Sequence, residues 1–262
     1  MRHANWLQAA ARAGYLSRGV VYGVVSFFAI LASVGAGSSK GTKGALVTLL
    51  SQPFGSVLVA VLVAGLFGLV VWRLVQAVLD ADNHGWSAQG LVVRLALLAS
   101  AATYTALALY AIGLLGITGS GGGKLLPNVL NAVSQGLGQR LFVAGLSLVF
   151  LGIAAAHWWK AYSGKYTKHF DENEAPMRVV HVVSVLGLAA RGVVFALLSV
   201  MIWLGIEGAA TSDGDLPSTL DALRYIQELP YGRIMLFALA VGLMIFAIYS
   251  FVESRWRRVS LA

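Results

Sequence analysis

The chain of 262 residues has no cysteine and few charged side chains. Without cysteine it has no disulfide and no thiol chemistry, and the sequence gives no indication of the redox compartment. Charged residues make up 11% of the chain, whereas soluble domains carry roughly 25%. Hydrophobic residues make up 58%. This composition excludes an ordinary soluble domain and indicates a protein that lies within a membrane.

Acidic residues are also scarce, and none lies deep within an apolar run, since Glu207 and Glu253 are at the ends of such runs. Ion-coupled transporters usually bind their ion near the membrane midplane, so this scarcity argues against that class. The sequence has no phosphate-binding loop and no paired metal ligands. We therefore expect no enzyme activity, no metal and no cofactor.

Long uncharged runs are what the sequence has in abundance. Four of them occupy residues 19–39, 44–72, 95–123 and 234–252, and two less clean runs occupy 141–159 and 185–206. Each meets the requirement of about 18 residues for crossing the hydrocarbon core. The run at 185–206 contains Arg191. The sequence predicts an all-α polytopic membrane protein with six transmembrane helices, forming a single membrane domain over residues 1–262.

The chain also repeats itself. Residues 13–22 return as 186–195, at an offset of 173, and Pro53-Phe54-Gly55 returns as Pro230-Tyr231-Gly232, at an offset of 177. A weaker copy lies between them, in which Arg94 matches Arg12 at an offset of 82. The pattern predicts three two-helix repeats at about 5–83, 84–170 and 175–258. Because each repeat holds two spans, we expect a pseudo-threefold axis along the membrane normal.

Each repeat is expected to contain a long helix, a short outer segment and a second helix. The predicted short segments are 44–52, 125–138 and 216–229. Small residues spaced four apart recur in the three first helices, which predicts close packing of these helices around the axis. These helix-packing candidates are Gly19 and Gly23, Ala101 and Thr105, and Gly192 and Ala196. A ring around a central cavity is the alternative arrangement.

Lysine and arginine predict the orientation. With six spans, thirteen of the 19 basic residues fall on the side that holds both termini. The positive-inside rule therefore predicts cytoplasmic termini. The net charge of +8 is explained by the orientation of the protein in the membrane and by attraction to anionic headgroups of the inner leaflet. No nucleic acid is expected as a partner.

Several motifs resemble a known family. They are Arg18-Gly-Val-Val-Tyr22, Ala190-Arg-Gly-Val-Val-Phe195, Gln52-Pro-Phe-Gly55 and Trp72-Arg-x-x-Gln-Ala77. Together they are similar to the bacterial membrane family catalogued as domain of unknown function 1206. The resemblance implies a multi-pass protein of the bacterial inner (plasma) membrane and brings no activity with it. The middle repeat departs from the pattern, because Ser100 stands where the outer repeats have arginine.

Polar side chains near or inside the spans are the functional candidates, since ionisable groups are costly there. Arg18 lies one helical turn from Tyr22, and Arg191 one turn from Phe195. A guanidinium in this position can bind a phosphate, a carboxylate or a lipid headgroup; the alternative is a structural arginine that snorkels or ties helices together. The remaining lipid- or anion-binding candidates are Arg73, Gln76, Arg94, Tyr104, His157 and Lys160. For the helix-end residues Arg73, Gln76, His157 and Lys160, an ordinary interfacial belt is the alternative.

The sequence thus predicts an integral inner-membrane protein with a structural or a lipid- and anion-binding role. Membrane lipids are the expected partners, and we also consider an accessory subunit that contacts another membrane protein or a second copy. The alternative function is a small channel or transporter with its pathway along the pseudo-threefold axis.

Overall fold

The computed structural model describes residues 2–81, 85–117, 139–164, 166–167, 170, 175–203 and 219–257. The regular elements within these ranges are all α-helices: α1 (Arg2–Ser33), α2 (Thr42–Leu50), α3 (Gly55–Val78), α4 (Ala88–Leu114), α6 (Gln139–Ser163), α7 (Met177–Trp203), α8 (Thr219–Glu228) and α9 (Gly232–Trp256). All of them except α2 and α8 are long and apolar enough to cross a membrane. This confirms the predicted all-α fold with six transmembrane helices, including the fifth span with Arg191 inside it.

The short helices α2 and α8 correspond to two of the predicted outer segments. The third predicted segment, 125–138, lies outside the described residues. After both α2 and α8 the chain turns sharply into the next span through a non-glycine residue with left-handed backbone, Phe54 at φ 58° and Tyr231 at φ 60°. A side chain on the following Gly55 or Gly232 would overlap carbonyl oxygens of the preceding short helix. The repeated Pro-Phe/Tyr-Gly motif therefore encodes the same turn twice.

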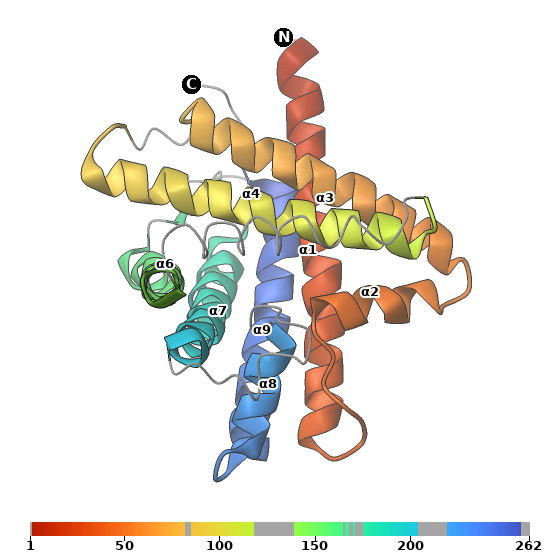
Figure 1. Cartoon of the computed structure of the whole chain (residues 1–262). Coiled ribbons are helices and arrows are strands. Elements are labelled where there is room, and N and C mark those ends of the chain that lie inside the picture. Colours follow the sequence, from red (N-terminus) through yellow and green to blue (C-terminus); the bar gives the residue numbers. More distant parts are fainter. Residues whose placement is uncertain are drawn as a thin grey trace.

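The described helices pack mainly through α1, α3, α7 and α9. Helix α1 packs against α3 and α9, α7 packs against α6 and α9, and α3 packs against α4. In Figure 1 α1 and α9 run side by side, with α3 and α4 crossing them obliquely. The start of α1 and the end of α9 lie at the same end of the bundle, as an even number of crossings requires.

Glycines allow two of these helix pairs to approach closely. At the α1–α3 crossing, a Cβ on Gly14 would overlap Leu69 and one on Gly68 would overlap the Ala10 carbonyl. At the α7–α9 crossing, a Cβ on Gly187 would lie 2.7 Å from the Cα of Phe246. Gly187 is Gly14 at an offset of 173, and Phe246 is Leu69 at an offset of 177. The first and last sequence copies therefore use the same helix crossing.

The predicted seam of small residues between the first helices is corrected by these contacts. A Cβ on Gly19 would meet Phe251 of α9, one on Gly192 would meet Trp158 of α6, and Gly23 faces open space. The other predicted packing residues are Ala101, which is buried near Tyr15 and Trp72, and the half-buried Thr105 and Ala196. The close approaches of α1 and α7 are instead to second helices, because the spacing of small residues defines a face and not its neighbour.

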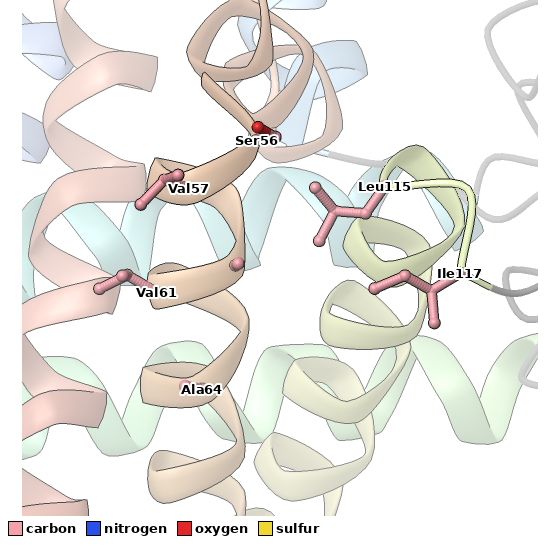
Figure 2. A pocket seen from close by; sticks show the side chains of 7 residues that line it. Ser56, Val57, Val61, Ala64, Leu115 and Ile117 are labelled. Carbon is pink, nitrogen blue, oxygen red and sulfur yellow. The ribbon is translucent and has the colours of Figure 1, made fainter. Parts of the chain in front are cut away.

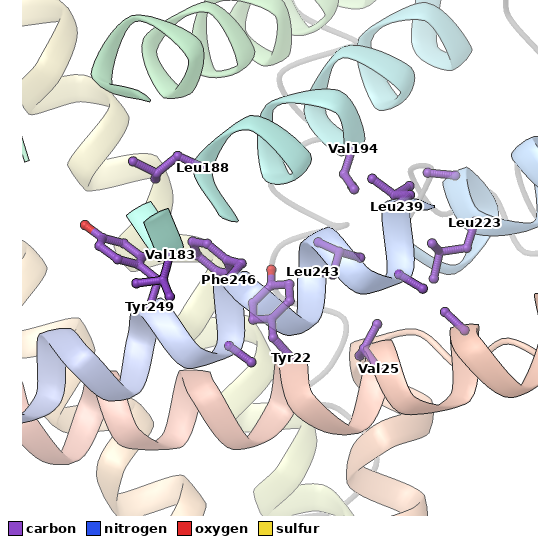
Figure 3. Packing of buried hydrophobic residues seen from close by; sticks show 14 of the residues in the cluster. Tyr22, Val25, Val183, Leu188, Val194, Leu223, Leu239, Leu243, Phe246 and Tyr249 are labelled. Carbon is purple, nitrogen blue, oxygen red and sulfur yellow. The ribbon is translucent and has the colours of Figure 1, made fainter. Parts of the chain in front are cut away.

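The largest buried cluster joins α1, α7 and α9 (Figure 3). Tyr22 of α1 meets Phe246 of α9 edge to face, with ring centroids 5.2 Å apart. Leu188 and Val194 of α7 and Leu243 of α9 extend the same cluster. Tyr22 and Phe246 of this core also contact the buried arginines described below.

We expect Gly68→Ala to lower the melting temperature in detergent, because its Cβ would press against the backbone of Ala10. Overpacking of this kind costs about 1–3 kcal/mol. Gly23→Ala is the matched control, since nothing lies within 4 Å of a Cβ there and alanine favours the helix. Equal melting temperatures for the two variants would contradict the α1–α3 crossing.

Candidate functional site

A buried ion pair joins α1 to α9. Arg18 is 4% exposed and Glu253 is 2% exposed. The Nη2 of Arg18 pairs with Oε2 of Glu253, and its Nε donates to the Ser250 hydroxyl at 3.0 Å. The other Glu253 oxygen accepts from Nη1 of Arg257 at 2.6 Å. One carboxylate therefore holds two guanidinium groups inside the bundle.

Aromatic rings enclose the same pair. The Arg18 guanidinium lies 5.0 Å from the ring centroids of both Tyr15 and Phe246. The indole Nε1 of Trp72 donates to the Tyr15 hydroxyl at 2.9 Å, so α3 is tied to the same group. Cation–π contacts of this kind are stronger when water is excluded.

The sequence indicated Arg18 as a candidate but not its partner. The position of Glu253 at the end of an apolar run gives no sign of a partner, whereas the structure makes it the counterion of Arg18. This geometry is that of the structural alternative, an arginine that ties two helices together. A signal was present in the repeat, since Glu253 occupies the position of Gln76 at an offset of 177.

Arg191 of α7 lies among aromatic rings. Its guanidinium is 4.6 Å from the centroid of Tyr22, 4.7 Å from that of Phe246 and 4.9 Å from that of Phe195. The phenol of Tyr22 interacts with Arg191, and the phenol of Tyr104 on α4 interacts with both Arg18 and Arg191. The structure thus brings four predicted residues, Arg18, Tyr22, Tyr104 and Arg191, into one group.

Helix α6 adds His157 and Lys160. The His157 ring packs against Phe195 with centroids 5.3 Å apart, and its Nδ1 lies 2.8 Å from the Ile153 carbonyl oxygen. Arg191 and Lys160 both interact electrostatically with His157. Lys160 also interacts with Glu253, which links α6 to the buried ion pair.

Arg73 and Gln76 lie at the cytoplasmic-side end predicted for α3. The Nη1 of Arg73 donates to Oε1 of Gln76 at 3.0 Å, and the guanidinium lies 5.9 Å from the Tyr15 centroid. The Nε of Arg73 is buried without a hydrogen-bond partner among the described atoms. Arg73 also interacts with Glu253.

Arg94 has a different role. Its Nε donates to the Ala77 carbonyl at 2.6 Å and its Nη2 to the Val78 carbonyl at 2.9 Å. The guanidinium also lies 4.1 Å from the centroid of Trp86. Basic side chains at a helix C-terminus satisfy its last carbonyls in this way, so Arg94 caps α3 and is a structural residue.

Among the described residues, basic side chains outnumber carboxylates around Glu253. Four of them interact electrostatically with this carboxylate, namely Arg18, Arg257, Lys160 and Arg73, and Arg191 shares the Phe246 ring with Arg18. We call the five basic residues with Glu253 the basic cluster. Charge is costly within a membrane protein, which makes this cluster the candidate binding site.

Other parts of the described structure carry less chemistry. An apolar groove of about 520 Å³ lies between the start of α3 and the end of α4, lined by Ser56, Val57, Ala60, Val61, Ala64, Leu115 and Ile117 (Figure 2). It has no charged lining residue and suits an acyl chain. Within the described ranges no group of three or more His, Asp or Glu side chains is arranged to hold a metal ion.

Replacing Glu253 should destabilise the protein strongly. Glu253→Gln removes the counterion of Arg18 and Arg257, and breaking a buried pair by removing one partner costs about 3–5 kcal/mol. Thermal unfolding in detergent measures the loss. Glu228→Gln at the exposed end of α8 removes the same charge and should leave the melting temperature unchanged. A Glu253→Gln variant as stable as this control would refute the role of the ion pair.

Comparison with known proteins adds the family. The family model described as Domain of Unknown Function (DUF1206) matches residues 13–80 and 186–257. The matched regions contain Arg18, Arg73, Arg191, Glu253 and Arg257, while His157 and Lys160 lie between them. The chain is 29% identical over 260 residues to the uncharacterized protein YxxB of Bacillus subtilis (strain 168), across 97% of this chain and 93% of that protein. No solved structure matches. The chain belongs to the family of membrane proteins defined by domain of unknown function 1206.

Proposed function

We propose that this protein binds an anionic headgroup of the membrane at the basic cluster, and that the Arg18–Glu253 pair is the structural tie that holds the site together. The observation that carries the proposal is the gathering of basic side chains among the described residues: four of them interact with the Glu253 carboxylate, and Arg191 lies over the Phe246 ring that Arg18 also contacts. A bound anion would interact favourably with these side chains, since charge-assisted hydrogen bonds to phosphate are strong where water is excluded.

Two arginines of the cluster are not bonded to Glu253. The carboxylate is directly bonded to Arg18 and Arg257, whereas the closest described partners of Arg73 and Arg191 are an amide and aromatic rings. Those groups orient a guanidinium without neutralising it. An anion that reaches Arg73 or Arg191 would therefore gain more than one that approaches Arg18.

Access from the bilayer favours a lipid as the source of the anion. In the most apolar stretch of α6 only 11% of the residues are buried, compared with 56% in α1. Trp158 and Trp159, which directly precede Lys160, are exposed. Tryptophan beside a basic residue is typical of the headgroup level. These features support a site that opens sideways toward lipid headgroups.

The alternative of a pathway along the pseudo-threefold axis has less support. Tyr22 and Tyr104 are buried and both interact with Arg191. Buried aromatic side chains at this level support close packing between the described helices. A binding or structural role, including that of an accessory subunit beside another membrane protein, agrees better with such packing than a channel, and the proposal includes no enzyme activity.

The proposal also includes a location in the bacterial inner membrane with the basic cluster at the cytoplasmic side. The support is the excess of lysine and arginine on the side of both termini. Reporter fusions at Ala262 and near Ser39 should report opposite sides of the membrane, with the Ala262 fusion cytoplasmic. A periplasmic Ala262 would refute the orientation.

Lipid retention tests the binding function. Native mass spectrometry of the purified protein should show preferential retention of phosphatidylglycerol and cardiolipin over phosphatidylcholine. Arg191→Gln and Arg73→Gln should each reduce that preference several-fold. Arg233→Gln, an exposed arginine at the start of α9 and at the opposite end of that helix from the cluster, is the matched control and should retain the wild-type preference. Equal retention of all three lipids by the wild type would sink the proposal.

A further inference from the structure

The first and third sequence repeats join their two helices by the same crossing, α1 with α3 and α7 with α9. Besides the glycine contacts described above, the two crossings share a second close contact. A Cβ on Gly65 of α3 would overlap Ser17 of α1. A Cβ on Gly242 of α9 would overlap Ala190 of α7 in the same way. These are corresponding positions, related by offsets of 177 on the second helix and 173 on the first.

The middle repeat leaves its two helices apart. Among the described helices α4 packs against α3 and α2, and α6 packs against α7, but no comparable packing joins α4 to α6. The six spans therefore form a series of neighbours, in the order α4, α3, α1, α9, α7 and α6, whose two ends are α4 and α6. Gly152 of α6 is the counterpart of Gly65 at an offset of 87. A Cβ on Gly152 would have no neighbouring atom within 4 Å.

The sequence nevertheless keeps the small residues that such a crossing needs. The positions that correspond to the two contacts of the outer repeats are Ala96 and Ala99 on α4, at an offset of 82, and Gly152 and Ala156 on α6, at an offset of 87. Gly152 and Ala156 are exposed, whereas large apolar side chains such as Leu95 and Leu148 occupy other exposed positions of these helices. Small residues allow helices to approach closely in lipid. The middle repeat thus retains a crossing that is not formed in this structure.

Arg191 lies between the two separated helices. On the α6 side, His157 packs against Phe195 with ring centroids 5.3 Å apart, and the Arg191 guanidinium lies 4.9 Å from the centroid of the same Phe195 ring. On the α4 side, the buried phenol of Tyr104 interacts with Arg191. Arg191 itself is only half-buried, in contrast to Arg18. Side chains from both edges of the gap therefore reach one partly accessible guanidinium.

We infer that α4 and α6 form a lateral gate to Arg191, which is open in this structure and closes when the two helices cross as those of the outer repeats do. This inference rests on the proposed function and specifies how a lipid reaches the site. With the gate open, an anionic headgroup binds Arg191 while its acyl chains remain in the bilayer between α4 and α6. Rearrangements of packed helices are a common basis of switching.

The lipid decides which form of the gate predominates. Acyl chains attached to a headgroup at Arg191 occupy the space that the closed crossing needs, so a bound anionic lipid is compatible with the open form alone. A ligand that binds one of two forms shifts the population toward that form. A lipid without net charge binds Arg191 weakly and leaves the small-residue crossing free to close.

Distances between spin labels test the gate, and the cysteine-free chain allows labels to be attached at introduced cysteines alone. Leu91→Cys with Tyr162→Cys labels exposed positions of α4 and α6. Pulsed electron paramagnetic resonance in nanodiscs should give two distances, and the longer should be several-fold more populated in phosphatidylglycerol than in phosphatidylcholine. Tyr162→Cys with Val179→Cys, on the packed helices α6 and α7, is the control pair and should give one distance in both lipids.

Three further variants, combined with the Leu91→Cys and Tyr162→Cys labels, identify the contacts responsible. Gly152→Leu adds bulk at the crossing and should leave only the longer distance. Gly145→Leu is the matched control, because Gly145 is also exposed on α6 without a neighbour within 4 Å of its Cβ, and it should keep both distances. Arg191→Gln should remove the difference between the two lipids. Both leucine variants should melt near the wild-type temperature, which checks folding.

Two results would overturn the inference. One is a single distance for the Leu91 and Tyr162 label pair in both lipids, and the other is a pair of distances whose proportions do not respond to Gly152→Leu or to the lipid. If native mass spectrometry still showed anionic lipids retained over phosphatidylcholine, the proposed function would stand while the gate fell. Equal retention of all lipids by the wild type would overturn the proposed function and the inference with it.

Discussion

The buried contact between Arg18 and Glu253 is the interaction on which the rest of this bundle depends. Within a membrane protein a guanidinium needs a partner, and here it comes from a residue 235 positions away. The pair fixes the first span against the last, and Tyr15, Phe246 and Trp72 pack around it. With Arg257 on the second carboxylate oxygen, Glu253 has little remaining capacity for other cations.

That limit gives the basic cluster its chemical character. Glu253 is already bonded to Arg18 and Arg257, so Arg73 and Arg191 are the arginines of the cluster to which a further anion can bind. The surroundings decide which anion can bind. Aromatic rings orient Arg191, and two exposed tryptophans directly precede Lys160. The structure combines a buried ion pair between α1 and α9 with an α6 helix whose surface is largely exposed.

Sequence reasoning predicted what depends on length, composition and local turns. The six spans and the short helices α2 and α8 follow from uncharged runs and from the repeat. The Pro-Phe/Tyr-Gly motif marks the repeat in the sequence, but the left-handed turn at Phe54 and Tyr231 is evident only in the structure. The partner of Arg18 was not predicted, because no local pattern relates residues from the two ends of a chain. The seam through Gly19 and Gly192 was assigned to the wrong neighbours for the same reason. Gly14 and Gly187, which do form close crossings, lay in the repeated segment without being singled out.

The most direct test of this account is an experimental density map of the protein in nanodiscs that contain phosphatidylglycerol and cardiolipin. The account predicts that Arg18 contacts Glu253, and that headgroup density lies within hydrogen-bond distance of Arg73 or Arg191. A map in which Arg18 and Glu253 lie apart, or in which protein carboxylates neutralise both Arg73 and Arg191 and no headgroup lies beside them, would contradict it.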